Sequence, residues 1–442
     1  MFDRLNQPIS FRRRSEPTDA PDATLPAPAS PAAGGTPDAG GTPDVDAPQG
    51  PATPAIVPLG PATTRASRKR RRTSSLVGLE IEPGQLVAVK SHVNGRVVVD
   101  RAVGTPIAPN LVRDGEVTDV EGLSSALADL FDGSGLDRRV RIGIANQRIV
   151  MRQIELPPIL DPKELEHAVR FQAQDEIPMP IESVVLDYHA LGITETEAGP
   201  RMRVLLVAAR RDMVERVLLA ARQAGLRPEG VDLAAFGMIR ALRPLDVPDG
   251  ERVLYLSIGG MTNLAIANGA TCEFTRAITN GIDLIVSEVA SRAGVPFADA
   301  RRLVASVSGT TGGARALVSV GDSEASPTPA QAPEAPATDG GNDPEHAEYA
   351  RTALGDGVRR IAAEIRNSLD FHLGARGEGP VSRAILTGPA LDLKDFDLAL
   401  GREIGIPLVR GEVELASAAA SGHVPMSRLA VAAGLSVEEG RK

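Results

Sequence analysis

Three β-rich runs separated by short turns occur twice along the chain. The first copy, VGLEIEPGQLVAVKSHVNGRVVVDRAV, follows Leu76, and the second, VLYLSIGGMTNLAIANGATCEFTRAI, begins at Val253. The turns are Pro83-Gly84 and Asn94-Gly95 in the first copy, and Gly259-Gly260 and Asn268-Gly269 in the second. Asn-Gly between β-rich runs is a strong hairpin signal, because a type I′ turn needs positive φ at both central residues. The pattern therefore predicts two three-stranded meanders, each opening one half of the protein.

Helices and further strands are predicted after each meander. The clearest helix begins at Asp161, which caps it, with Pro162 in the first turn and Glu164 completing a capping-box pattern. Apolar residues at helical spacing predict the other helices at 121–131, 211–224, 281–292, 298–304, along a long segment around 358–369, from Asp392, and at 428–435. Apolar runs predict strands at 140–144, 184–191, 203–208, 228–231 and 384–387. Together these elements predict a duplicated α/β fold.

Two segments lack periodic hydrophobic pattern. Residues 1–75 hold 13 of the 35 prolines and end in the basic run Arg68 to Arg72, and residues 306–346 hold five more prolines. Neither buries enough apolar surface to offset chain entropy, so we expect a disordered arm and a disordered linker. The basic run is interpreted as a solvated tether, or alternatively as a contact with the anionic cytoplasmic leaflet.

Composition narrows the class of protein. Cys272 is the only cysteine, which excludes an intrachain disulfide and a cysteine-rich zinc site and favours a reducing, cytoplasmic compartment. The sequence contains no run of about 20 apolar residues, so no membrane span is predicted. The net charge of −9 and the 3% aromatic content argue against a nucleic-acid partner. The histidines are scattered without metal-ligand spacing, which argues against a metal hydrolase. No GxSxG elbow occurs, which argues against a serine hydrolase.

A long block in the middle of the chain resembles the type IV pilus assembly protein PilM family. The block comprises LPPILDPKELEHAVRFQAQDEIPMPIESVVLDYHALG at 156–192 and RVLLVAARRDMVERVLLAARQAGLRPEGVDLAAF at 203–236. Weaker similarity continues through EIRNSLDF, AILTGPA and LAVAAGL. The resemblance as a whole covers about 76–305 and 347–437. The resemblance implies a duplicated actin-like (ribonuclease H-like) fold with an inserted FtsA/PilM-type α/β subdomain. It implies actin-like segments at 76–153, 236–305 and 347–442, with the insertion at 154–235.

The resemblance also implies an ATP site with Mg²⁺ between the halves. Its phosphate loops map to residues 80–85 and 257–263. An acidic residue beside such a turn holds the metal ion or its waters, a role that falls to Glu80. The residues implied to bind nucleotide are Gly84, Gln85, Gly259, Gly260, Met261, Thr262, Glu364, Ser368 and Gly388.

The loops depart from the family pattern. Where the family has Asp-Ile-Gly, this chain has Glu80, Ile81 and Glu82. Glu82 brings a carboxylate near the phosphates, and Pro83 removes one backbone donor. The second loop begins with Ser257 in place of aspartate. We therefore expect weak or lost ATP hydrolysis.

The function implied is that of a cytoplasmic scaffold peripheral to the membrane. Proteins of this family capture the amino-terminal peptide of a PilN-type membrane protein, and so connect the pilus motor to the PilN/PilO inner-membrane complex. We expect the peptide groove to involve residues 154–235. One alternative is an active actin-like ATPase in which Glu80 replaces the usual aspartate. The other is an FtsA-like cell-division tether, which is disfavoured because FtsA-like chains end in an amphipathic membrane helix and this sequence ends at SVEEGRK.

Overall fold

A computed structural model describes residues 10–11, 76–197, 199–246, 248, 250–308, 344–376 and 379–437. The predicted arm at 1–75, apart from Ser10 and Phe11, lies outside these residues, as does the linker between 309 and 343. In the part of the chain that is described, no helix is long and apolar enough to cross a membrane.

The first half is built on a seven-stranded sheet with the strand order β1-β11-β7-β2-β3-β4-β17. Its strands are β1 (Ser10–Phe11), β2 (Val77–Glu82), β3 (Gln85–Asn94), β4 (Arg96–Pro106), β7 (Arg139–Ile144), β11 (Arg227–Leu233) and β17 (Glu414–Leu415). A small hairpin and four helices accompany the sheet: β5 (Val112–Arg113), β6 (Glu116–Val117), α1 (Val120–Phe131), α3 (Arg211–Gln223), α4 (Ala234–Leu242) and α9 (Ala430–Leu435). The first meander is confirmed, because β2, β3 and β4 pair antiparallel in succession.

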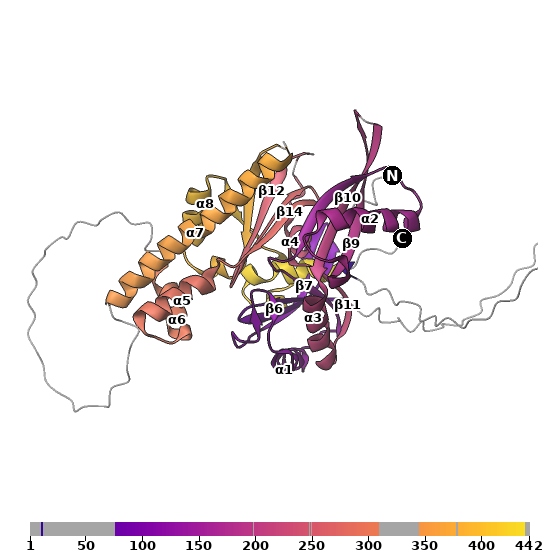
Figure 1. Cartoon of the computed structure of the whole chain (residues 1–442). Coiled ribbons are helices and arrows are strands. Elements are labelled where there is room, and N and C mark those ends of the chain that lie inside the picture. The colour runs from indigo at the N-terminus through magenta and orange to yellow at the C-terminus, as the bar shows by residue number, and fades with distance from the viewer. Residues whose placement is uncertain are drawn as a thin grey trace, which may run out of the picture. The chain divides into compact units, whose positions relative to one another are not determined.

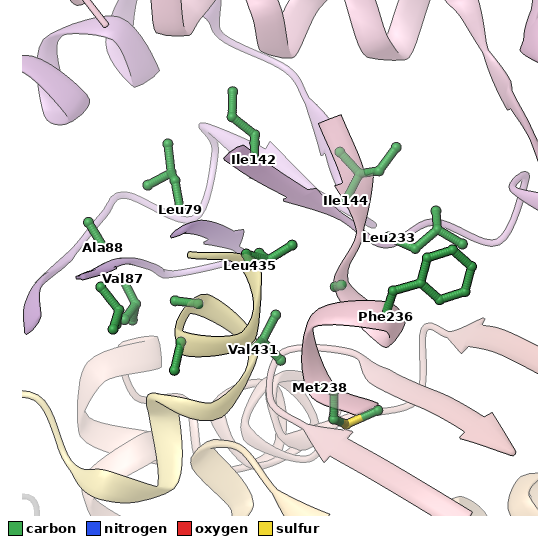
Figure 2. Packing of buried hydrophobic residues seen from close by; sticks show 14 of the residues in the cluster. Leu79, Val87, Ala88, Ile142, Ile144, Leu233, Phe236, Met238, Val431 and Leu435 are labelled. Carbon is green, nitrogen blue, oxygen red and sulfur yellow. The ribbon is translucent and has the colours of Figure 1, made fainter. Parts of the chain in front are cut away.

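The carboxyl-terminal helix α9 is part of the core of this first half. Figure 2 shows Val431 and Leu435 of α9 between the strands that carry Leu79 and Val87 and the helix α4 that carries Phe236. Every residue of α9 is buried, and α9 packs on α4, β2 and β3. A segment that ends the described chain thus completes the core that the first meander begins.

A separate three-stranded sheet lies between β7 and α3 in the sequence. Its strands are β8 (Val150–Leu156), β10 (Gly199–Arg210) and β9 (Val184–Thr196), and they pair antiparallel in that order. The helix α2 (Pro162–Glu176) covers one face, and a short 3₁₀ helix, η1 (Ile181–Ser183), precedes β9. Asp161 caps α2 as predicted, since its carboxylate accepts hydrogen bonds from the backbone N–H groups of Lys163 and Glu164 at 2.9 Å. Side chains of α2 and this sheet form their own hydrophobic cluster.

The second half is built on a five-stranded sheet with the order β14-β13-β12-β15-β16. Its strands are β12 (Arg252–Ile258), β13 (Thr262–Asn268), β14 (Thr271–Ile278), β15 (Val381–Thr387) and β16 (Leu408–Arg410). Its helices are α5 (Ile282–Ala293), α6 (Phe297–Val307), α7 (Pro344–Arg376) and α8 (Phe396–Ile404). Figure 1 shows α7 running along this sheet, with α5 and α6 packed near its amino-terminal end. The apolar face predicted on α7 is buried here, and the second meander is confirmed.

Several sequence predictions need correction. The helix predicted from Asp392 begins at Phe396, because residues 389–392 form a 3₁₀ helix, η2 (Pro389–Asp392), and Asp395 adopts a positive φ of 60°. The ends of the predicted linker, at 306–308 and 344–346, belong to α6 and α7 or adjoin them. The predicted closing helix at 428–435 divides into η4 (Met426–Arg428) and α9. The strand β8 and the helix α4 were not predicted.

The proposed boundaries of the inserted subdomain remain a prediction. Within 154–235, β9, β10 and α2 belong to the separate three-stranded unit, whose third strand, β8, begins earlier, at Val150. By contrast, β11 pairs parallel with β7 in the seven-stranded sheet, and α3 packs on α1. The last part of the predicted insertion therefore contributes to the core of the first half.

Candidate functional site

The first predicted loop is a tight turn that joins β2 to β3. Gly84 has a φ of 83°, which a residue with a side chain rarely adopts. On either side of this turn, Glu80 is only 6% exposed and Gln85 only 9% exposed. The turn thus has the glycine that the sequence predicted, but its flanking polar side chains point into protein rather than solvent.

The second predicted loop joins β12 to β13 and leads toward α5. The Gly259 N–H donates to the Met261 carbonyl oxygen at 2.8 Å, and the Gly259 carbonyl accepts from the N–H of Ile282 at 2.8 Å. Thr262 is fully buried, and its hydroxyl donates to the carbonyl oxygen of Asn280 at 2.6 Å. The polar groups at Gly259 and Thr262 are therefore used in holding the loop against the start of α5.

The two turns contact each other directly. A Cβ atom placed on Gly259 would lie 2.7 Å from Glu82 Oε2, and one placed on Gly260 would lie 3.0 Å from Pro83 Cβ. Gly260 also faces Asp283, whose Oδ2 would lie 2.7 Å from such a Cβ. A side chain at Gly259 would require Glu82 to move, and one at Gly260 would require Asp283 to move. Two of the residues by which the first loop departs from the family pattern, Glu82 and Pro83, lie against the second loop.

The predicted adenosine residue Gly388 is also near both loops. Its φ is 94°, and a Cβ there would lie 2.8 Å from the backbone nitrogen of Ile258. Its N–H donates to the carbonyl oxygen of Ser427 at 2.7 Å. Gly388 lines a closed space together with Glu80 and Gln85, among other residues. The structure thus brings residues from both loops and from Gly388 into one cleft.

An arginine that the sequence reasoning missed spans this cleft. The Arg428 guanidinium donates to Gln85 Oε1 at 2.5 Å, and to Asp392 Oδ2 at 2.6 Å and 3.0 Å. Ser427 Oγ donates to the other oxygen of the same carboxylate at 2.7 Å. Gln85 in turn donates to Glu82 Oε2 at 3.3 Å. No local sequence signal marks this network, because Gln85 and Arg428 lie more than 300 residues apart.

The carboxylates of the cleft are destabilised in their charged form. Burial raises the pKa of Glu80 well above its ordinary value, and the charge of Glu82 raises it further. Burial likewise raises the pKa of Glu82 to about 7, although Arg428 opposes this change. Burial also raises the pKa of Asp283, which pairs with Arg301 at 3.0 Å. The cleft is therefore an unfavourable environment for added negative charge.

Glu364 and Ser368 lie elsewhere. They share a face of α7, as their spacing predicts, and both contact Arg276 of β14. Arg276 is 3.3 Å from the Glu364 carboxylate and donates to Ser368 Oγ at 3.1 Å. Ser368 is 1% exposed, and its hydroxyl donates to the carbonyl oxygen of Glu364 at 2.8 Å. Neither residue lines the closed space that contains Gly388.

A nucleotide with Mg²⁺ does not fit the cleft as these residues are arranged. The space among Glu80, Gln85, Gly388 and their neighbours is too narrow to hold a water molecule. The carboxylate of Glu82 lies against the loop on which phosphate oxygens would rest. Across the residues that the structure describes, no group of three or more acidic, histidine or cysteine side chains is placed to hold a metal ion. The predicted roles of ATP, Mg²⁺ and Glu80 as a metal ligand stay predictions.

A groove of substantial volume lies away from this cleft. It has a volume of about 450 Å³ and is bordered by the β3–β4 hairpin, the end of α4, β9 and the segment after β16. Apolar side chains and four arginines line it: Val93, Leu191, Phe236, Leu242, Leu245, Arg96, Arg240, Arg243 and Arg410 are among them.

Comparisons with known proteins agree with this architecture. The profile of the family described as Type IV pilus assembly protein PilM matches residues 79–305. A solved structure described as a PilM-PilN type IV pilus biogenesis complex is similar with 23% identity and a TM-score of 0.63, covering 82% of this chain and 97% of that one. Ethanolamine utilization protein EutJ from Carboxydothermus hydrogenoformans has 12% identity and a TM-score of 0.45, covering 81% and 88%. MreB 5 of Spiroplasma citri, solved with AMPPNP, has 11% identity and a TM-score of 0.45, covering 82% and 95%. The fold is the predicted duplicated actin-like fold with an inserted subdomain.

Proposed function

The chain belongs to the type IV pilus assembly protein PilM family, and we propose that it is a cytoplasmic scaffold that binds the amino-terminal peptide of a PilN-type membrane protein. The family match carries this proposal, because residues 79–305 include most of the first half of the fold and the three-stranded sheet inserted in it. The similar structure solved as a PilM-PilN complex supports the same class of partner. Through that peptide the chain connects the pilus motor to a PilN/PilO complex at the periphery of the inner membrane.

The peptide binds as an added strand at the outer edge of β11. An extended segment already pairs with this edge: Ser10 lies opposite Asp232 and Phe11 opposite Val231, in an antiparallel arrangement. The same segment, β1, contacts β9 of the inserted sheet. Both β9 and β11 fall within residues 154–235, where the sequence predicts the peptide groove. Strand addition gives affinity through main-chain hydrogen bonds, while neighbouring side chains select the sequence.

Because the strand that pairs with β11 belongs to this chain, a partner peptide has to displace it. Removing residues 1–11 is therefore expected to increase peptide affinity, and a synthetic peptide of residues 1–14 is expected to compete with the partner peptide. This competition gives a test of the binding site that leaves the folded core unchanged.

Isothermal titration calorimetry of the whole chain with a PilN-type amino-terminal peptide from the same source tests the proposal. We expect binding in the micromolar range, which strengthens when residues 1–11 are absent. No binding at high micromolar peptide would reject the function. Leu245→Asp serves as a matched control, because Leu245 is 58% exposed and lines the 450 Å³ groove instead of the β11 edge. Loss of binding in this variant would move the peptide into that groove.

A further inference from the structure

The cleft between the two loops is closed by side chains of the protein itself. The Glu82 carboxylate and the Pro83 ring occupy the space above the Gly259-Gly260 turn at contact distances of 2.7 Å and 3.0 Å from the positions of added Cβ atoms. In a phosphate-binding turn, this is the space that must remain open for oxygens to approach the backbone N–H groups. One of those donors, the N–H of Gly259, already bonds to the Met261 carbonyl oxygen at 2.8 Å.

The closure is held by a continuous network of polar contacts. Glu82 accepts from Gln85, Gln85 accepts from Arg428, and Arg428 donates twice to Asp392. Gln85 begins β3 of the first sheet, whereas Asp392 ends the 3₁₀ helix that follows β15 of the second sheet. The network therefore links the two halves of the fold at the place where the sequence resemblance implies a nucleotide.

The charges around the turn disfavour a triphosphate. The Glu82 carboxylate approaches Gly259, and the Asp283 carboxylate approaches Gly260. The two arginines in contact with this group, Arg428 and Arg301, already have carboxylate partners. An incoming phosphate chain would have to displace these carboxylates or be repelled by them.

We propose that the Glu82 carboxylate takes the place of a nucleotide phosphate in this cleft, so that the two halves are held closed by Glu82, Gln85, Arg428 and Asp392 and the protein works without ATP. This proposal adds nucleotide independence to the scaffold function, and its first experiment does not depend on that function. In a chain of this kind the affinity for the peptide does not depend on a nucleotide cycle, in contrast to an ATPase whose cycle alters partner affinity.

Titration of the full chain with Mg·ATP and with ATP alone, followed by calorimetry, is the direct test. We expect no binding up to 1 mM nucleotide, and saturable binding with a Kd below about 100 μM would overturn the proposal. The double variant Glu82→Gly, Pro83→Gly removes both groups that cover the second loop, and we expect it to gain measurable ATP binding. The control Glu195→Gly changes an exposed glutamate on β9 and is expected to gain none. A folded double variant that gains no affinity would reject the role assigned to Glu82.

A second experiment separates this proposal from the scaffold function. Affinity for the PilN-type peptide is measured with and without 1 mM Mg·ATP, and we expect the same value within a factor of two. A change of fivefold or more would overturn nucleotide independence while leaving peptide capture intact. If the peptide fails to bind in both conditions, the scaffold function is rejected, and the direct nucleotide titration still decides whether the cleft excludes ATP.

Discussion

Ionisation of Glu82 is expected to make the stability of the fold depend on pH. In the unfolded chain this carboxyl has an ordinary pKa near 4.5, whereas burial raises its pKa in the folded protein to about 7. Between these values the folded state keeps a proton that the unfolded state has lost, so stability falls as pH rises from about 4.5 to about 7. At roughly 1.4 kcal/mol per pKa unit, the difference corresponds to about 3 kcal/mol. Because part of the side chain reaches solvent, we expect about 2 kcal/mol.

Urea unfolding of the wild type and of Glu82→Gln at pH 5 and pH 8 measures this effect. The variant cannot ionise at this position, so its free energy of unfolding should fall less between the two pH values, by about 2 kcal/mol. Groups that both proteins share cancel in the comparison, apart from Glu80, whose pKa Glu82 also raises. Loss of that interaction reduces the pH dependence of the variant further, in the same direction. Glu195→Gln should follow the wild type, and parallel pH profiles for wild type and Glu82→Gln would refute the reasoning.

Two further predictions concern the core of the first half, and both are checked by urea unfolding. Gly434→Ala should lower the free energy of unfolding by more than about 2 kcal/mol, because the added methyl would lie 1.8 Å from a carbonyl oxygen of α4. The control Gly374→Ala, which has open space around it on α7, should not lower the free energy of unfolding. Asp232→Ala should lower the free energy of unfolding by about 3 kcal/mol, because it leaves Arg240 without its buried carboxylate partner. The control Asp299→Ala breaks an exposed ion pair and should lower the free energy of unfolding by less than about 1 kcal/mol.

Local sequence signals predicted the meanders because those signals have a local physical cause. Gly95 and Gly269 have φ values of 73° and 58°, so glycine is favoured at both turns. Neither Asn94 nor Asn268 has a positive φ, so the hairpins form as predicted but their turns are not of the expected type I′. The helix α4 was missed because nearly every residue of Ala234–Leu242 is apolar and buried, so its sequence has no polar face to mark a helical period. The start of α8 was misplaced because Asp395 adopts a left-handed conformation that the neighbouring sequence does not predict.

The candidate site was predictable only in part, and the reason is sequence distance. Glycines at 84, 259 and 388 stand out as turn residues next to strands, and the fold brings their loops together. The guanidinium of Arg428 and the side chain of Gln85 are brought together only by the tertiary fold, so nothing within a window of the sequence indicates their contact. The sequence departures at Glu82 and Pro83 predicted that the loop would repel phosphate. That these two residues pack against the second loop could be seen only in the structure.

Closure of the cleft and completion of the core depend on the same segment of the chain. Arg428 ends η4, and α9 begins two residues later and packs on β2, β3 and α4. Breaking the bridge from Arg428 should therefore loosen the cleft first and leave the buried helix in place. For Arg428→Gln we expect faster backbone hydrogen exchange at Gly388, whose N–H bonds to Ser427, with unchanged protection in β12. Arg302→Gln removes an exposed pair on α6 and should leave exchange in the cleft unchanged. Equal exchange at Gly388 in the wild type and Arg428→Gln would mean that core packing alone holds the two halves closed.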